Sequence, residues 1–136
     1  MTVRKFLAVA IGLTLVGGMA AGAAPRYDGP KLAWVIKSFV DKKGNPHSRL
    51  LLSIDGKLVL IERDVQEELR SMARDDFVPY QVPKKALIAC YGWFAGAGDE
   101  FYVIRKANAF AVYRQMGDCS PDSGLQPWRR IKTIRE

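Results

Sequence analysis

A glycine-rich run with two carboxylates and five aromatic residues lies between residues 90 and 102, where the sequence reads CYGWFAGAGDEFY. Glycine loops can bind phosphate, but a P-loop continues into GK[ST] and a helix, and a dinucleotide fingerprint also opens a helix. Here Gly98 is followed by Asp99 and Glu100 and then by residues that alternate as in a strand. The two carboxylates would also repel a phosphate. We therefore expect no nucleotide site, and the run predicts a hairpin corner in which glycine relieves backbone strain.

Asp99 and Glu100 are the carboxylates with the strongest claim to acid–base chemistry, such as the cleavage of a glycosidic bond. As neighbours on an extended strand they point to opposite faces, so they cannot flank one bond together. Each would need a partner from elsewhere, for example Glu62 or Asp118. A hydrolase that uses Asp99 or Glu100 therefore stays an alternative. Its substrates would be envelope polymers, because the N-terminus described below has the pattern of an export signal. A non-enzymatic protein is favoured.

His47 is the single histidine of the chain. No spacing selects Ser48, Ser53 or Ser71 as its nucleophile partner, and no G-x-S-x-G elbow is present. One histidine and two cysteines cannot supply the three or four protein ligands of a zinc site, and the acidic loop DCSPDSG lacks the twelve-residue EF-hand pattern. We expect no catalytic residue, no metal and no cofactor.

The two cysteines, Cys90 and Cys119, are separated by 29 positions. No C-x-x-C motif is present, which disfavours a redox-active thiol. An even number of cysteines in an exported protein favours one disulfide. By the chain-entropy estimate, such a bond would add about 3–4 kcal/mol to the free energy of unfolding.

Aromatic and basic residues gather in the C-terminal part of the chain, where nine of the fourteen aromatic residues lie between Tyr80 and Trp128. Strand alternation sends Phe101 and Arg105 to one face and Tyr102 to the other, so one aromatic set is expected to be exposed. Exposed aromatic rings beside arginine bind polysaccharides, peptides and acidic polymers. The alternative is that the rings fill the core and arginine stems cover them. The candidate binding residues are Trp93, Phe94, Tyr102, Arg105, Arg114, Trp128 and Arg130.

The elements that must position these residues are mainly strands. Residues 31–63 predict a three-stranded meander, and Asp55-Gly56 between its second and third strands is typical of a type I′ turn. Asp64, followed by Glu67 as in a capping box, predicts a helix over residues 64–76.

Three further strands are expected between residues 86 and 117, and Asn108 is expected to take a left-handed turn conformation between the last two. Residues 127–136 can be a helical turn or a strand, and we favour a closing edge strand. The predicted fold class is therefore mainly β with one helix (α+β), in the order β-β-β-α-β-β-β with this closing strand. The expected architecture is a small antiparallel sheet or partly open barrel with one disulfide.

The N-terminus has the pattern of an export signal. Arg4 and Lys5 precede an apolar run over residues 6–16, and small residues then favour cleavage near Ala23. The alternative is an uncleaved anchor, although a spanning helix needs roughly 20 apolar residues. We expect a signal peptide over residues 1–23, an extended lead-in over residues 24–30 and a single domain over residues 31–136. No membrane span is expected after cleavage, and the location would be periplasmic or secreted.

Cleavage would leave 19 basic and 14 acidic residues, a formal net charge of +5. This balance favours anionic partners without specifying one, and an exported protein rarely meets nucleic acid. We expect a small exported binding protein that recognises an anionic envelope polymer or a protein partner through a basic-aromatic C-terminal sheet. A structural role in envelope assembly is a further alternative.

Overall fold

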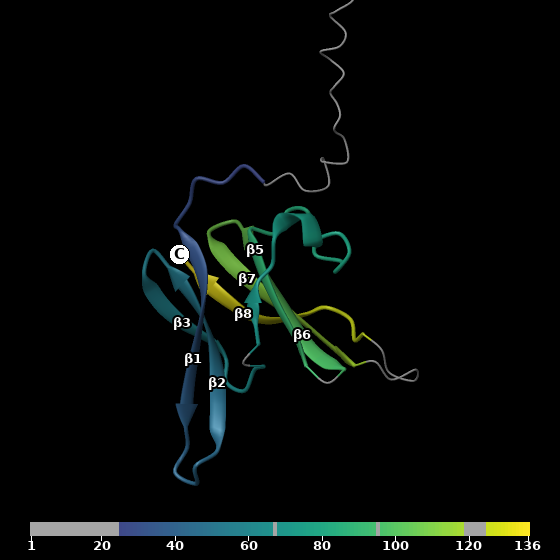
Figure 1. Cartoon of the computed structure of the whole chain (residues 1–136). Helices are drawn as coiled ribbons and strands as arrows, with labels where there is room; N and C mark the ends of the chain where they lie inside the picture. Colours follow the sequence, from purple (N-terminus) through teal and green to yellow (C-terminus); the bar gives the residue numbers. More distant parts are fainter. Residues whose placement is uncertain (1–24, 67, 95, 119–124) are drawn as a thin grey trace, which may run out of the picture.

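The structure, a computed structural model, describes residues 25–66, 68–94, 96–118 and 125–136. It contains two antiparallel sheets, one of three strands and one of five. Figure 1 shows the three-stranded sheet in blue and teal beside the five-stranded sheet, which runs from teal to yellow. The expected single sheet or partly open barrel is therefore wrong, because the strands are divided between two sheets.

The three-stranded sheet is a meander of β1 (Leu32–Val40), β2 (Pro46–Ile54) and β3 (Lys57–Glu62). At the turn between β2 and β3 the backbone φ is 51° at Asp55 and 87° at Gly56. Positive φ at both central residues is what a type I′ turn requires, so the predicted hairpin is confirmed.

The five-stranded sheet has its strands in sequence order. They are β4 (Arg70–Ser71), β5 (Ile88–Phe94), β6 (Ala97–Lys106), β7 (Ala109–Asp118) and β8 (Arg129–Arg135). The left-handed residue at the turn between β6 and β7 is Ala107, with φ 55°, and not Asn108 as expected. The closing strand favoured for the C-terminal segment is present as β8, at one end of the sheet.

The main core lies between the two sheets. Its members from the three-stranded sheet include Leu50 and Leu52, and those from the five-stranded sheet include Phe101, Val103 and Phe110, all fully buried. We call the face of the five-stranded sheet that carries these residues its inner face. Burial of such side chains stabilises a fold by about 1.5–3 kcal/mol each, so this layer is the main source of stability.

The opposite, outer face of the five-stranded sheet carries a second apolar cluster. Tyr102 and Ile104 on β6 and Ala111 on β7 belong to it, together with Phe77 and Val82 from the segment between β4 and β5. Alternation along β6 is thus confirmed, since Phe101 and Val103 face inward while Tyr102 and Ile104 face outward. Both sets are buried, however, because the segment over residues 72–86 covers part of the outer face.

The predicted helix over residues 64–76 is wrong: the described residues contain no α-helix, and only a 3₁₀ turn occurs at Arg74–Asp76. The segment instead bonds to both sheets, since the Val65 amide donates to Ser48 (3.1 Å) and the Met72 amide to Ala89 (2.8 Å). Val65 packs on the core between the sheets and Met72 on the outer cluster. A short helix can bury its one narrow apolar stripe against one surface only, whereas this extended segment places apolar side chains on both the core between the sheets and the outer cluster.

In contrast to the expected one-disulfide fold, the structure shows no disulfide in the residues that it describes, where Cys90 is a thiol buried between the sheets. Its expected partner, Cys119, lies outside the described residues. Burial raises the pKa of the Cys90 thiol well above its usual range, and the nearby Asp99 carboxylate adds to this effect. Cys90 is therefore an apolar core residue and not a nucleophile.

The glycine-rich run forms the corner between β5 and β6, as predicted. Gly96 lies at the turn with φ 83°. A Cβ at Gly98 would lie 2.5 Å from the Trp93 ring and 2.6 Å from the Gly92 carbonyl oxygen, so the indole packs directly on the glycine backbone.

Among the described residues, no helix is long and apolar enough to span a bilayer.

Candidate functional site

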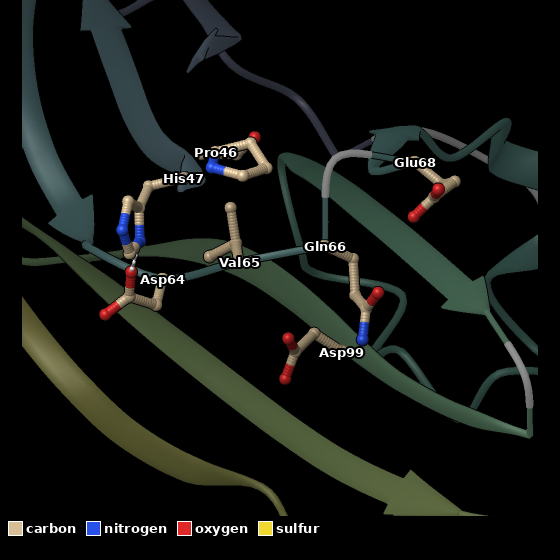
Figure 2. Close-up of a pocket in the computed structure, with 8 residues that line it drawn as sticks. Pro46, His47, Asp64, Val65, Gln66, Glu68 and Asp99 are labelled. Atoms are coloured by element: carbon tan, nitrogen blue, oxygen red, sulfur yellow. Dashed lines mark hydrogen bonds and ion pairs between the residues drawn. The ribbon is translucent and has the colours of Figure 1, made fainter. Parts of the chain in front are cut away.

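A polar pocket of about 400 Å³ opens between the start of β2, the segment after β3, and β6 (Figure 2). It is lined by Pro46, His47, Ser48, Asp64, Val65, Gln66, Glu68 and Asp99. The fold brings His47 and Asp99, two candidates for acid–base chemistry, to the same pocket. Whether they can act depends on their hydrogen-bond partners.

Both ring nitrogens of His47 are occupied. Nε2 lies 2.8 Å from an Asp41 carboxylate oxygen, and Nδ1 lies 3.0 Å from an Asp64 carboxylate oxygen. The hydrogen bonds to Asp41 and Asp64 raise the pKa of His47, and the bond from His47 lowers the pKa of Asp41 to about 2. With both nitrogens hydrogen-bonded to carboxylates, the ring offers no free lone pair to a substrate proton or a metal. Ser48 is buried and pairs with the Ser38 hydroxyl at 3.1 Å, so it is no nucleophile for His47.

Asp99 is held as an ion pair on the inner face. The Arg114 guanidinium donates to one Asp99 oxygen at 2.8 and 3.0 Å and to a Glu62 oxygen at 2.9 Å. The Arg114 side chain is only 13% exposed and that of Asp99 only 8%. The structure therefore brings Asp99 and Glu62 together, but around a cation that links the two sheets.

Glu100 lies on the opposite face of β6 and is almost completely buried. Trp93 Nε1 donates to its Oε2 at 3.1 Å, whereas Oε1 has no partner among the described residues. Burial raises the pKa of Glu100, with a further increase from Asp99, and the Trp93 bond only partly offsets them. Asp99 and Glu100 thus have different environments on different faces, and neither pairs with the other across a cleft.

The raised pKa of Glu100 predicts that stability falls as pH increases. The neutral carboxyl is favoured in the folded state, so this contribution is complete below the unfolded-state pKa and is lost as pH rises through the folded-state value. The Glu100→Gln variant removes the titration and keeps an acceptor for Trp93. We expect it to gain about 1 kcal/mol relative to the wild type between pH 4 and pH 8. Urea denaturation at both pH values measures this; parallel pH profiles for the two proteins would contradict it.

The structure divides the predicted binding residues between the two faces. Arg105 and Arg114 have acidic partners: Arg105 makes two 2.7 Å hydrogen bonds to Glu136, and its guanidinium lies 5.5 Å from the centre of the Tyr27 ring. Neither arginine carries an unpaired charge. Trp93 packs on Gly98, and the side chain of Phe94 lies outside the described part of the structure.

The other predicted residues lie on or beside the outer face. Tyr102 stacks on Tyr113 with ring centres 4.9 Å apart, and Trp128 meets Tyr102 edge-on at 4.7 Å. The Lys106 ammonium donates to the Tyr113 hydroxyl at 3.2 Å. Arg130 is the cross-strand partner of Tyr113, and partners directly opposite point to the same face. Aromatic rings and basic groups therefore adjoin here.

Basic side chains without a carboxylate partner cluster on the last strand of this sheet. We define the β8 basic edge as four exposed side chains on the last strand: Arg129, Arg130, Lys132 and Arg135. None of them has a carboxylate within 4.0 Å among the residues that the structure describes. Of this set, only Arg130 was among the binding residues predicted from the sequence. The repeated basic residues of RRIKTIR could have indicated a basic strand, but the exposure of its edge depends on β8 being the terminal strand of the sheet.

No group of three or more His, Cys, Asp or Glu side chains in the described ranges could hold a metal ion. Comparisons of the chain with models of protein families, with curated proteins and with solved structures found no match.

Proposed function

We propose that the protein is a small exported binding protein whose β8 basic edge takes an anionic partner. The observation that carries this proposal is the contrast between two sets of cations. Arg105 and Arg114 are neutralised by carboxylates, whereas the four cations of the β8 basic edge are exposed and lack such partners among the described residues. Clustered, unneutralised charge raises the encounter rate with polyanions and contributes to their affinity.

The neighbouring aromatic residues support the same surface. Tyr113 and Trp128 are half-buried, so each ring is held in place by the fold and still has exposed area. A rigid aromatic group beside arginine or lysine suits a polymer that carries both charge and apolar or flat groups. The export signal expected over residues 1–23 would place such a surface among the acidic components of the cell envelope.

The alternative of a hydrolase receives less support from the geometry. Asp99 is bound by Arg114, Glu100 is buried on the other face, and His47 has both nitrogens engaged. None of the three is a free acid or base beside a substrate cleft.

The test is a matched pair of charge-reversal variants. Arg130→Glu/Arg135→Glu changes the β8 basic edge, and Lys42→Glu/Lys43→Glu makes the same charge change on the exposed loop between β1 and β2. We expect the wild type to bind heparin or poly-L-glutamate, used as model polyanions. The β8 variant should bind at least tenfold more weakly, about 1.4 kcal/mol, and the loop variant should bind nearly as well as the wild type.

Titration at two salt concentrations measures these affinities, and circular dichroism verifies that each variant is folded. Equal losses in the two variants would mean that only overall net charge matters. Absence of binding to both probes would overturn the proposal.

A further inference from the structure

Among the described residues, the backbone of β8 has one edge without a pairing strand. β8 is the last strand of the order β4-β5-β6-β7-β8, and its one neighbour in the described part of the chain is β7. A terminal strand presents a row of unpaired amide and carbonyl groups along its free side. The hydrogen bonds of the described residues give none of these groups on the free side of β8 a partner.

The register identifies which amides lie on that side. The Glu136 amide donates to the Asn108 carbonyl at 3.0 Å, so it points toward the β7 side. Backbone groups alternate in direction along an antiparallel strand. The amides of Ile134 and Lys132 therefore point toward β7, and those of Thr133 and Arg135 point to the free edge.

The side chains beside this edge differ between the two faces. Arg130, Thr133 and Arg135 are paired with Tyr113, Ala111 and Ala109, which places them on the outer face. Ile131 and Ile134 instead pack against the core between the sheets, and they are only half-buried. The outer face of the free edge is thus basic, whereas on the inner face the two isoleucines adjoin Arg129 and Lys132, the cross-strand partners of Arg114 and Val112.

A second copy of the chain is a poor occupant of this edge. Pairing β8 with β8 would set four basic residues against four identical ones, and like charges placed opposite one another on adjacent strands destabilise the pair. Lysine and arginine on an edge strand are a common protection against such self-pairing. The same charges favour an acidic strand, for which the electrostatic term changes sign.

From these observations we propose that the partner is an extended acidic polypeptide segment that adds to β8 as a sixth strand of the sheet. Arg130 and Arg135 share the outer face because β8 has a bulge at Ile131, at the register shift between Val112 and Tyr113. Acidic side chains on one face of the added segment would face these two arginines, and apolar side chains on its other face would face Ile131 and Ile134. Main-chain hydrogen bonds to Thr133 and Arg135 would give affinity, as in other cases of strand addition. This inference rests on the proposed function, since it names the class of anion that the β8 basic edge takes.

The test uses an eight-residue peptide of alternating valine and glutamate, together with the ¹⁵N-labelled protein. We expect the saturating peptide to slow hydrogen exchange of the Thr133 and Arg135 amides at least tenfold, because they become hydrogen-bonded. The Ile134 amide, which points toward β7, serves as the internal reference. The same peptide N-methylated at every residue keeps its charges but cannot donate, and it should bind at least tenfold more weakly.

A pair of protein variants gives an independent measurement. Thr133→Pro removes one donor from the free edge, a position that tolerates proline, and Thr133→Ala is its control. We expect the proline variant to lose at least fivefold in affinity for the peptide while retaining its affinity for heparin.

The outcomes separate the two proposals. If the peptide binds but Thr133 and Arg135 stay unprotected, or if the N-methylated peptide binds equally well, strand addition is wrong and the anionic binding surface stands. If neither the peptide, poly-L-glutamate nor heparin binds, the proposed function is wrong as well.

Discussion

Replacing Arg114 with methionine is expected to lower the free energy of unfolding by about 3 kcal/mol. The substitution leaves the Asp99 carboxylate, which is 8% exposed, buried without its cation. It also breaks the bond to Glu62, which ties β3 to the five-stranded sheet. Methionine retains most of the side-chain volume over the Phe101 ring, where the guanidinium lies 5.4 Å from the ring centre. The loss therefore reports on the unpaired charge, and urea denaturation at pH 7 measures it.

The double variant Arg114→Met/Asp99→Asn is the matched control. Removing the unpaired Asp99 charge should recover at least half of the loss. A loss below about 1 kcal/mol would show that the ion pair behaves like an exposed one. If the fold is retained, binding at Arg130 and Arg135 should be unchanged, because these two lie on the outer face, whereas Arg114 lies on the inner face beside its cross-strand partner Arg129.

Replacing Phe101 with alanine is expected to cost about 3–5 kcal/mol. The side chain is 0% exposed and lies between the two sheets, with its ring centre 6.4 Å from that of Trp34 on β1. Truncation leaves a cavity that neither sheet can fill without moving. Since a domain of this kind typically has roughly 5–15 kcal/mol of stability, the variant should unfold at a much lower urea concentration.

Leu58→Ala is the control, because Leu58 is also a strand residue but is 41% exposed. Its cost should stay below about 1 kcal/mol. Equal losses for the two variants, or a normal urea midpoint for Phe101→Ala, would contradict the assignment of the core to the layer between the sheets.

The backbone conformation of a turn was predictable from the sequence where a few adjacent residues determine it. Asp55-Gly56 specifies its own turn, since few other pairs accept positive φ at both positions. Gly96 and its neighbours likewise specify a corner. The turn after Lys106 was only half predicted, because the hairpin forms but Ala107 and not Asn108 takes positive φ.

The helix prediction failed because a capping pattern reports only local preference. Asp64 and Glu67 match a capping box, but the apolar residues that follow belong to different cores. Leu69 contacts the core between the sheets, whereas Met72 contacts the outer cluster. Burial against two surfaces is a tertiary contribution, and it outweighs the modest helical propensity of the segment.

By itself, the sequence determined the Asp55-Gly56 turn, the glycine corner between β5 and β6, the alternation of faces along β6 and the number of cations in the C-terminal region. The tertiary structure alone decided which of those cations are free. Arg114 meets Glu62 from 52 positions away, and Arg105 meets Glu136 from 31 positions away. It also made β8 the terminal strand of its sheet. The physical reason is that charge pairing and edge exposure depend on distances between residues far apart in the chain, which only the packing of the two sheets sets.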